Sequence, residues 1–546
     1  MDLSADEGET PRTPDTLVLD DNIYLSPAGR ARLEGDFARL IPDNSPAKVA
    51  FSELAAAIKA TPKVERPWRH LIHINEAQET LETEMEISEV ESDDEEHRLI
   101  WTGHYRFSLT NSLLPQQFSR YGWILGGGRK ELKDDGVDIM LTLTKAQHRV
   151  RGRHARLALN DKSNALLLVV DPEKKVRLNG EPIQNESRVI TARRTRLEIG
   201  LLQYCFEYTG LSHIRYHDQL EKLRNSNVLQ GTVHKALEAT PTEKQIPMDN
   251  YIIHPPFAYG SYGVISACVR RTDGAPFAAK RVARTARSQS EIDFEIAMFT
   301  AVGGHPNTCE LIEVLDTKSL FTESPYDEVY IIHTPLAECS FEDLSLTTHG
   351  YEVCMKALAE VIRGVEHIHH LGYTHRDIKP TNLLFCGQEG QAVVADYGQG
   401  MKQETSKDHK KGTIKYLAPE VLELKRRDAL KTKETEDSKP YGNKVDVWSL
   451  GLVGFELFFR PRGARENPDL STEKIHQLRM KYLRESRLPV APFLQRMLSW
   501  NVESRPSMAE VASWSIWPNP PPEHTIDSRK RLINATISEP EVADAE

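Results

Sequence analysis

The sequence has few cysteines and no long apolar run. Six cysteines are scattered through 546 residues, and no two of them have the C-x-x-C spacing of zinc or redox sites. This argues against a disulfide framework and favours a reducing compartment. The N-terminus lacks the basic start and apolar core of a secretory leader, and no run approaches the roughly 18 apolar residues of a membrane span. We therefore expect an intracellular protein, in the nucleus or cytoplasm, that has no membrane partner.

The negative charge of the chain is concentrated in one short block. The formal net charge is −11, and Glu76 to Glu96 contains eleven Asp or Glu and no Lys or Arg. That block accounts for the whole excess, so the rest of the chain is close to neutral. A near-neutral remainder argues against direct binding of nucleic acid or anionic lipid by bulk electrostatic attraction.

Composition changes several times along the chain, and its length predicts more than one domain. Pro, Asp and small polar residues at the start are typical of disorder. Short apolar runs separated by turns then favour an antiparallel β-sandwich. The segments that we expect are a disordered tail at 1–66, an acidic segment at 67–97, the sandwich at 98–210, a linker at 211–248 that is partly helical around His217 to Leu223, a second domain at 249–517 and a disordered tail at 518–546.

The stretch Tyr373 to Asn382 reads YTHRDIKPTN and combines three groups that phosphoryl transfer needs. Asp377 can accept the proton of an acceptor hydroxyl, Lys379 can offset charge on the moving phosphoryl group, and Asn382 can bind Mg²⁺. The stretch resembles the H-R-D-x-K-x-x-N catalytic loop of eukaryotic protein kinases.

Further kinase motifs follow in the order of the family. Asp396-Tyr397-Gly398 stands where relatives carry D-F-G, Ala279-Lys280 closes an apolar run, and Ala418-Pro419-Glu420 matches A-P-E. The resemblance implies a bilobal α+β kinase fold over 249–517 that uses ATP and Mg²⁺. It also implies that Asp396 and Asn382 are the metal ligands.

The resemblance extends to the residues that would hold the nucleotide. A Gly-bearing hairpin allows backbone amides to approach phosphates, and Lys280 would contact the α- and β-phosphates. Its helix partner is Glu295, with Glu291 as the rival one turn earlier. The position before the hinge, usually apolar, is His333. The predicted ATP-binding residues are Gly260, Gly263, Ile265, Lys280, Glu295, Thr334 and Leu336.

The segment from Asp396 to Glu420 contains two Ser or Thr hydroxyls before Gly412, those of Thr405 and Ser406. Arg376, beside the catalytic Asp, is a cation that a phosphate on this segment would pair with. The alternative is that Glu404 or Asp408 supplies the negative charge without modification.

Three further positions match the family pattern. Thr413, which in Ser/Thr kinases bonds the catalytic Lys and Asp, favours Ser/Thr over Tyr as acceptor together with Lys379. Asp446 matches a structural anchor, and Arg505 matches the ion-pair partner of Glu420. A charged insert at 422–440 is expected to be a mobile loop, either decorative or a docking site for partners.

The sandwich-like region resembles the forkhead-associated (FHA) domain through Gly128-Arg129, Arg153-His154-Ala155 and Leu178-Asn179-Gly180. The resemblance implies phosphothreonine binding by Arg129, whereas the usual Ser three residues before His154 is Arg151. The arginines of this region predict a basic surface that binds phosphate or docks on the acidic block of the same chain. They are Arg149, Arg151, Arg153, Arg156, Arg193, Arg194 and Arg196.

These motifs together predict a Ser/Thr protein kinase whose FHA-like module recruits or regulates, as in checkpoint and meiotic kinases of that architecture. Its partners would be protein substrates and phosphoproteins. One alternative is a kinase-fold scaffold without phosphotransfer, and another is a phosphoprotein-binding adaptor that works through the sandwich.

Overall fold

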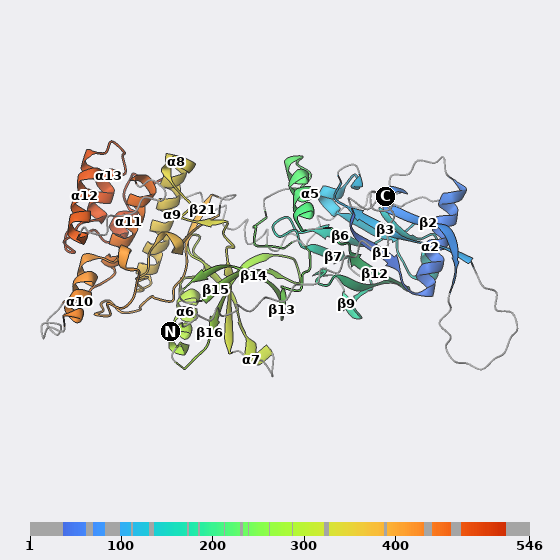
Figure 1. Ribbon diagram of the computed structural model, residues 1–546, viewed down its shortest axis with the longest axis horizontal. Coiled ribbons are helices and arrows are strands. Elements are labelled where there is room, and N and C mark those ends of the chain that lie inside the picture. Colours follow the sequence, from blue (N-terminus) through green and yellow to red (C-terminus); the bar gives the residue numbers. More distant parts are fainter. Residues whose placement is uncertain are drawn as a thin grey trace, which may run out of the picture. The chain divides into compact units, whose positions relative to one another are not determined.

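The structure is a computed structural model in which the chain divides into two compact units (Figure 1). Unit 1 comprises residues 1–158 and 166–230, and unit 2 comprises residues 159–165 and 231–546. The residues that the structure describes are 36–61, 69–81, 99–110, 113–129, 136–171, 174–183, 186–211, 213–229, 233–238, 240–260, 263–286, 288–320, 327–386, 390–430, 439–459 and 471–519.

Unit 1 contains a seven-stranded sheet and a five-stranded sheet, in the orders β2-β3-β1-β12-β11-β8-β9 and β10-β7-β6-β4-β5. Their side chains contact each other, because the rings of Phe107 on β3 and Trp123 on β4 lie 5.5 Å apart. Both rings are buried, and burial of large aromatic side chains stabilises such a core. The strands are β1 (Asp36–Pro42), β2 (Ile72–Thr80), β3 (Leu99–Ser108), β4 (Trp123–Gly127), β5 (Ile139–Thr142), β6 (Arg153–Leu159), β7 (Leu166–Val170), β8 (Val176–Leu178), β9 (Glu181–Ile183), β10 (Ser187–Val189), β11 (Arg194–Ile199) and β12 (Leu202–Tyr208).

The sequence patterns of these strands explain where they lie. Side chains of β12 alternate between buried and partly buried, as the period of two predicts for a strand with one face on the core. All residues of β4 and β5 are buried. These two strands pair in parallel, which corrects the expectation of a wholly antiparallel sandwich. Strands buried on both faces tolerate parallel pairing and read as continuous apolar runs.

The first two segment boundaries predicted for this region are wrong. Residues 36–61, expected to be disordered, form β1 and the helix α2 (Ser45–Ala60), and β2 lies within the expected acidic segment. The reason is burial: Phe37, Ala38 and Leu40 are at most 1% exposed, so this short stretch contributes core side chains despite its polar surroundings. Asn44 caps α2 by accepting a hydrogen bond from Ala47 N–H at 3.0 Å.

The helix predicted within the linker at 211–248, around His217 to Leu223, is present and is longer than expected. This helix, α5 (His213–Asn225), belongs to unit 1, where Tyr216 is fully buried with its ring 5.4 Å from that of Phe37. The linker ends in strand β13 (Ile246–Met248), which pairs with β14 in unit 2. The helix is polar on average, but Leu220 and Leu223 share the face of Tyr216 at helical spacing and are buried.

Unit 2 begins with an antiparallel six-stranded sheet in the order β13-β14-β15-β16-β18-β17. The helix α6 (Gln289–Val302) follows β16 and packs on β17. Apolar side chains such as Tyr251, Phe277 and Ile332 fill the core of the sheet. The strands are β14 (Tyr251–Gly260), β15 (Gly263–Arg270), β16 (Pro276–Ala283), β17 (Glu310–Asp316) and β18 (Glu328–Thr334).

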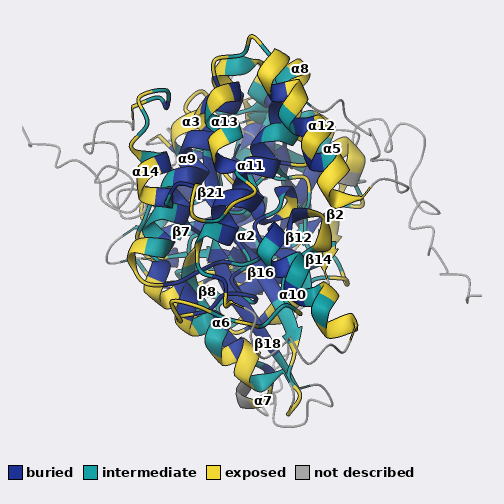
Figure 2. Cartoon of the chain, turned by 90° about the vertical axis from the view of Figure 1, so that its left-hand side faces the viewer, coloured by how far each residue is buried: buried dark blue, intermediate teal, exposed yellow. Residues whose placement is uncertain are grey.

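The second part of unit 2 is mainly helical and surrounds α9 (Tyr351–His370) and α11 (Lys444–Phe459), both of which are buried along most of their length (Figure 2). A three-stranded sheet in the order β19-β20-β21 carries the segments near the catalytic loop. The remaining elements are β19 (Cys339–Ser340), β20 (Leu383–Cys386), β21 (Gln391–Val394), α10 (Pro419–Ala429), α12 (Thr472–Glu485), α13 (Ala491–Met497) and α14 (Met508–Ala512), together with the four-residue helices α3 (Phe118–Tyr121), α4 (Lys145–His148), α7 (Thr317–Leu320) and α8 (Leu346–His349).

The charged insert at 422–440 is not a loop throughout. Helix α10 continues to Ala429, and Glu423 pairs with Arg426 and Arg427 one turn ahead. Such pairs support an exposed helix. Residues 431–438, where a mobile loop was predicted, lie outside the described residues. Within the described ranges, the helices are all too short or too polar to span a bilayer.

Candidate active site

Three side chains predicted to converge on the nucleotide meet between the six-stranded sheet and the helical part of unit 2. Lys280 Nζ on β16 donates to Glu295 Oε1 on α6 at 2.6 Å and to Asp396 Oδ1 at 2.8 Å. Lys280 is 5% exposed and Glu295 is 3% exposed, so the pair is shielded from water. The ion pair expected from the sequence is therefore present, and it joins β16, α6 and the segment after β21.

Electrostatics favour the charged forms of Lys280 and Asp396, whereas burial raises the pKa of Glu295. Burial lowers the pKa of Lys280, but the carboxylates of Asp396 and Glu295 raise it by more, so its pKa lies above the ordinary value. Burial raises the pKa of the Asp396 carboxyl, but the Lys280 ammonium outweighs burial and the net shift is downward. The ammonium and the carboxylate thus stay charged at neutral pH, as binding of phosphates and a metal ion would require.

The rival glutamate has a different partner. Glu291 Oε1 accepts a hydrogen bond from Lys411 Nζ at 2.6 Å, which links α6 to the segment after Asp396. Glu291 is half exposed, whereas Glu295 faces the interior. The structure therefore selects Glu295 as the partner of Lys280. The Lys411 contact was not predicted, because no pattern in the sequence pairs residues 120 positions apart.

The catalytic-loop residues form a second cluster around the Asp377 carboxylate, which is almost fully buried. Its Oδ1 accepts hydrogen bonds from Thr413 N–H at 3.0 Å and Thr413 Oγ1 at 2.8 Å. Its Oδ2 accepts from Lys379 Nζ at 2.7 Å and Asn382 Nδ2 at 3.1 Å. All four lone-pair positions of the carboxylate are therefore used. A substrate hydroxyl that donates to Asp377 would share the carboxylate with these donors.

A buried carboxylate beneath the catalytic loop fixes its path. Asp446 on α11 has no exposed surface and accepts hydrogen bonds from the backbone N–H groups of His375 and Arg376, both at 2.8 Å, and from His369 Nε2 at 2.8 Å. Arg376 lies in the left-handed region, with φ of 66°. Such strained backbone conformations persist where the surroundings hold them firmly, and they cluster at active sites. The predicted anchoring contacts of Asp446 are thus present.

Tyr397, in place of the family's Phe, is fully buried. Its ring lies 4.7 Å from that of Phe299 on α6 in a T-shaped contact. Its hydroxyl donates to Val394 O at 2.8 Å and accepts from Cys309 N–H at 3.1 Å. The additional oxygen of Tyr is therefore satisfied inside the core, and the ring packs on α6 while the neighbouring Asp396 contacts Lys280.

The segment after Gly398 is tied to the catalytic loop without modification. Arg376 Nε donates to Gln399 O at 2.6 Å and Nη2 donates to Gly400 O at 2.9 Å, while Nη1 lies 3.6 Å from Asp408 Oδ2. Of the two acidic residues weighed from the sequence, Asp408 is the one that faces Arg376. Ser406 forms an isolated β-bridge with Tyr441, with both backbone hydrogen bonds at 2.9 Å.

The predicted nucleotide loop is a hairpin between β14 and β15, in which Gly260 pairs with Gly263. The two residues between them lie outside the described residues. A Cβ on Gly263 would lie 2.6 Å from Arg281 O, so close approach of β16 already requires glycine there. Ile265 on β15 pairs with Lys280 on β16, and Thr334 is the last residue of β18. The nucleotide contacts of these residues and of Leu336 remain predictions.

His333 lies inside the core beside the hinge. It is 6% exposed, its ring is 5.5 Å from that of Phe299, and its Nδ1 has no hydrogen-bond partner among the described residues. Burial, with a smaller contribution from Lys280, lowers the pKa of His333 to about 4. The ring is therefore neutral at physiological pH and presents an unsatisfied polar atom where relatives carry an apolar side chain.

The predicted ion pair of the helical part is also formed. Arg505, which is 1% exposed, donates from Nη1 and Nη2 to the two carboxylate oxygens of Glu420 at 2.7 and 3.1 Å. The Arg505 guanidinium also lies over the Trp448 ring, 5.2 Å from the ring centroid. This bidentate contact links the start of α10 to the loop before α14.

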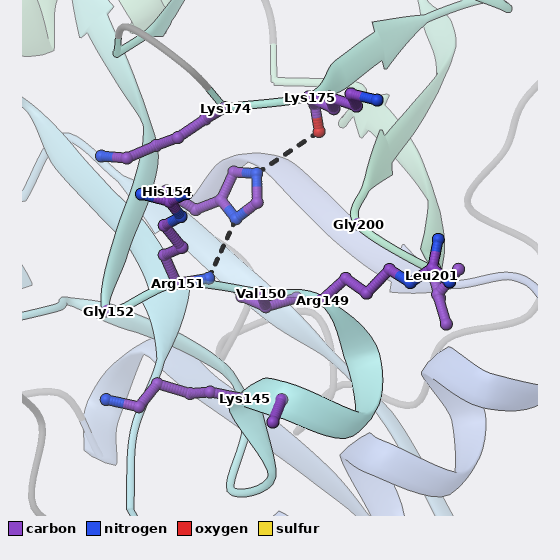
Figure 3. Close-up of a pocket in the computed structure, with 11 residues that line it drawn as sticks. Lys145, Arg149, Val150, Arg151, Gly152, His154, Lys174, Lys175, Gly200 and Leu201 are labelled. Atoms are coloured by element: carbon purple, nitrogen blue, oxygen red, sulfur yellow. Dashed lines mark hydrogen bonds between the residues drawn. The ribbon is translucent and has the colours of Figure 1, made fainter.

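The two residues predicted for phosphopeptide binding lie in different surroundings in unit 1. Arg151 lines a pocket (Figure 3), whereas Arg129 is not among the residues that line it. A Cβ on Gly126 would clash with Gly152 O, so this glycine lets the segment before β6 lie directly on β4 and places Arg151 at the rim. Of the seven arginines predicted to form a basic surface, Arg149 and Arg151 line the pocket.

The residues predicted to hold Mg²⁺ fit that ion chemically. Asn382 Nδ2 donates to Asp377, while Asn382 Oδ1 accepts from Thr381 Oγ1 at 3.5 Å and keeps a second lone pair that can bind a metal ion. The Ala395 N–H donates to Asn382 O at 2.9 Å, so the backbones that carry the two ligands are adjacent. Carboxylate and amide oxygens are the hard ligands that Mg²⁺ prefers.

Comparison with known proteins agrees with this geometry. Residues 256–515 match the family model of the protein kinase domain. The chain is 25% identical over 293 residues to calcium-dependent protein kinase 31 of Arabidopsis thaliana, covering 48% of this chain and 53% of that protein. It is 28% identical over 207 residues to human serine/threonine-protein kinase H1, covering 36% of this chain and 43% of that protein.

A third relative is the alpha chain of Drosophila melanogaster calcium/calmodulin-dependent protein kinase type II, which is 30% identical over 220 residues, covering 38% of this chain and 37% of that protein. The chain thus spans about half or less of the length of these relatives. The matched region contains both clusters described above, around Lys280 and around Asp377. Residues 256–515 therefore combine a match to this family model with the two clusters that phosphoryl transfer requires.

Proposed function

We propose that the protein transfers the γ-phosphoryl group of ATP to serine or threonine hydroxyls of protein substrates. The observation that carries this proposal is the arrangement of two intact clusters, Lys280 with Glu295 and Asp396, and Asp377 with Lys379, Asn382 and Thr413. Silent kinase-fold scaffolds usually lack one of the residues equivalent to Lys280, Asp377 or Asp396, and this chain keeps all three.

The roles of these side chains follow from the reaction. The acceptor oxygen attacks the γ-phosphorus, the bond from that phosphorus to the β–γ bridging oxygen breaks, and ADP leaves. Asp377 orients the acceptor hydroxyl and takes its proton, while Lys379 offsets charge on the transferred group. Lys280, held by Glu295, contacts the α- and β-phosphates. Asn382 and Asp396 would hold Mg²⁺, which neutralises charge on the phosphates.

The acceptor class rests on Thr413 and Lys379. Lys379 Nζ donates to Asp377 at 2.7 Å and also lies 3.3 Å from Thr413 Oγ1, so that the three groups form one network. This is the arrangement that the Ser/Thr pattern in the sequence predicts. Acid hydrolysis of the labelled substrate should yield phosphoserine or phosphothreonine, and phosphotyrosine as the main product would refute this assignment.

The activity is tested by incubation of the purified protein with labelled ATP and a generic basic protein. Asp377→Asn and Lys280→Met should each lower the rate of labelling by at least about a hundredfold, because each removes a group that acts on the reacting atoms. The matched controls Asp428→Asn and Lys474→Met change exposed residues of the same domain and should retain activity. Equal labelling by wild type and both active-site variants would refute phosphotransfer at this site. ATP binding without labelling would instead identify a scaffold.

We further propose that Asp408, and not a phosphate on Thr405 or Ser406, orders the segment beside Arg376. The support is the 3.6 Å separation of Asp408 and Arg376 and the backbone bridge between Ser406 and Tyr441. Asp408 is partly exposed, so its pair with Arg376 is screened and should change activity by only a few-fold. Asp408→Asn should lower the activity of unphosphorylated protein, whereas the double change Thr405→Ala and Ser406→Ala should leave it intact. Because Ser406 Oγ also accepts from Asp408 N–H at 3.0 Å, the reverse result together with phosphate found on Thr405 or Ser406 by mass spectrometry would identify phosphorylation as the switch.

For unit 1 we propose recruitment or regulation, as its resemblance to FHA domains implies. The family-typical contact is Arg129 with phosphothreonine. Binding of a singly phosphorylated threonine peptide that is lost on Arg129→Ala would support that role, and retention of binding in this variant would refute the role of Arg129.

A further inference from the structure

A short segment that precedes the family match at 256–515 contacts the hinge of unit 2. The segment comprises residues 233–238 and belongs to the same unit as the hinge. His234 Nε2 lies 2.8 Å from the backbone carbonyl oxygen of Ala337. Ala337 directly follows Leu336, which is predicted to contact the nucleotide. A side chain from outside the matched region is thus bonded to the backbone beside the predicted nucleotide site.

The hydrogen bonds of His234 define its protonation. The Ala236 N–H donates to His234 Nδ1 at 3.1 Å, so this nitrogen is an acceptor. The proton therefore resides on Nε2, and the ring donates to the carbonyl of Ala337. Burial lowers the pKa of His234, and the Ala337 carbonyl and the Glu338 carboxylate oppose this effect only partly. The ring is neutral at physiological pH, as these two hydrogen bonds require.

The same imidazole ring packs on the strand that leads to the predicted phosphate hairpin. The ring centroids of His234 and Phe257 lie 5.1 Å apart. Phe257 is on β14, three residues before Gly260, and its side chain is partly exposed. One side chain therefore contacts both the hinge and β14. The hinge and β14 have to keep a fixed spacing if they are to hold a base and its phosphates in one geometry.

Strand β14 has a weak point beside this contact. Its pairing with β15 shifts register on both sides of Pro256. Pro255 and Pro256 have no N–H groups to donate to a neighbouring strand. Next to them, the buried His254 accepts a hydrogen bond at its Nδ1 atom from the Glu238 N–H at 2.9 Å. Segment 233–238 is thus bonded to β14 as well as to the hinge.

The segment is itself held in a defined conformation. Leu237 has no exposed surface, and its N–H donates to His234 O at 3.0 Å. The Glu238 carboxylate accepts from Thr242 Oγ1 at 2.6 Å and from Gln245 Nε2 at 3.2 Å. These contacts fix the place of the His234 ring before any nucleotide binds.

We propose that His234 is a positioning residue for the nucleotide, which fixes the hinge relative to β14 and thereby sets the affinity for ATP from outside the matched region. This inference rests on the proposed function in that ATP is the nucleotide, but it concerns binding and not transfer of the phosphoryl group. The bond to Ala337 is present before the nucleotide arrives, so it acts alike on the ground state and the transition state. Its loss should raise the KM for ATP and leave kcat nearly unchanged.

The first test measures kcat and the KM for ATP with the full chain and a generic basic protein. In His234→Ala the KM for ATP should rise by about three- to tenfold, because one hydrogen bond between neutral groups is lost, while kcat changes by less than about twofold. His370→Ala removes an exposed histidine at the end of α9 and is the matched control, which should behave as wild type does. An unchanged KM for ATP in His234→Ala would overturn the proposal.

Two conservative variants separate the hinge contact from the turn of the segment itself. Asn at position 234 can still accept the Ala236 N–H but is too short to reach Ala337, whereas Gln places an amide N–H near the position of Nε2. His234→Gln should therefore keep the KM for ATP within about twofold of wild type, and His234→Asn should resemble His234→Ala. Thermal unfolding of each variant reports its stability. If the KM follows this stability and not the presence of the hinge donor, the role of His234 is structural only and the proposal is wrong.

Direct binding distinguishes this inference from the proposed function. A fluorescent ADP analogue with Mg²⁺, titrated into the same variants, should bind His234→Ala about three- to tenfold more weakly than wild type. Wild-type protein that binds the analogue but labels no substrate would refute phosphotransfer and leave the role of His234 intact. Equal binding by wild type and His234→Ala would overturn the positioning role alone. If wild type binds no nucleotide, both inferences are wrong.

Discussion

The buried carboxylate of Asp446 provides a sharp prediction about how the catalytic loop is held. It accepts three hydrogen bonds, two on Oδ2 from His375 N–H and His369 Nε2 and one on Oδ1 from Arg376 N–H. In Asp446→Asn, one oxygen becomes an amide that can only donate. If the remaining oxygen keeps the two bonds of Oδ2, the new amide faces the Arg376 N–H, and two donors then oppose each other in the core.

The magnitude follows from the bonds lost. A hydrogen bond to a charged group contributes about 1.5–3 kcal/mol, and leaving a buried donor without a partner has a similar cost. Asp446→Asn should therefore lower the free energy of unfolding of unit 2 by about 2–4 kcal/mol. The matched control is Asp428→Asn, whose carboxylate is 61% exposed and 3.1 Å from His409 Nε2. That exposed pair should contribute less than about 1 kcal/mol.

Two measurements check this prediction. Urea unfolding followed by circular dichroism gives the change in stability, and amide hydrogen exchange of the peptide that spans 373–382 reports the local effect. We expect faster exchange at His375 and Arg376 in Asp446→Asn, together with lower phosphotransfer activity. If Asp446→Asn is no less stable than Asp428→Asn and exchange at these amides is unchanged, Asp446 does not hold the loop.

Three further predictions concern other buried contacts. Glu295→Gln should reduce phosphotransfer strongly and destabilise unit 2, because Lys280 loses one of its two carboxylate partners. Glu291→Gln changes a half-exposed contact and should reduce activity only slightly. Equal effects of the two variants in kinetic assays would contradict the selection of Glu295. Tyr397→Phe, although it restores the family residue, should destabilise unit 2 by about 0.5–1.5 kcal/mol in urea unfolding, because the two hydrogen bonds of the hydroxyl are lost while Cys309 N–H keeps its bond to Val394 O at 3.0 Å; an unchanged midpoint would refute this. In the folded protein burial holds the pKa of His154 below its ordinary value of 6.5, so the unfolded state binds more protons below that pH. The stability contributed by neutral His154 is therefore complete above about pH 6.5 and is lost as pH falls. In urea unfolding at several pH values, His154→Gln should flatten this pH dependence of unit 1.

Much of the candidate active site could be predicted from local sequence. Asp377, Lys379 and Asn382 lie within six residues, so their order along the chain nearly determines their proximity. Lys280 and Asp396 were predicted to meet through the order of the motifs, and they do so at 2.8 Å. The choice between Glu295 and Glu291 required the structure, because both lie on one helix and only its rotation decides which carboxylate faces inward.

What the sequence did not predict depends on contacts between distant residues. Residues 36–42 were expected to be disordered because their neighbours are polar, and their core contacts are with strands more than 60 residues away. A helix around His217 to Leu223 was predicted, but its packing on the core was not, because the helix is polar on average and buries one face through Tyr216, Leu220 and Leu223. Average composition conceals such narrow apolar stripes. The bond between His234 and the hinge likewise joins residues 103 positions apart.

The place of β1 also determines when the first unit can fold. This strand lies between β3 and β12, and Ala38 pairs with both Phe107 and Tyr208. During synthesis, therefore, β1 cannot complete its pairing until β12 has left the ribosome. Folding through contacts between such distant residues is slow. A fragment that starts at residue 67 would lose the strand that joins the two halves of the sheet. The bare edges of β3 and β12 would then be exposed, and aggregation of that fragment is the expected outcome.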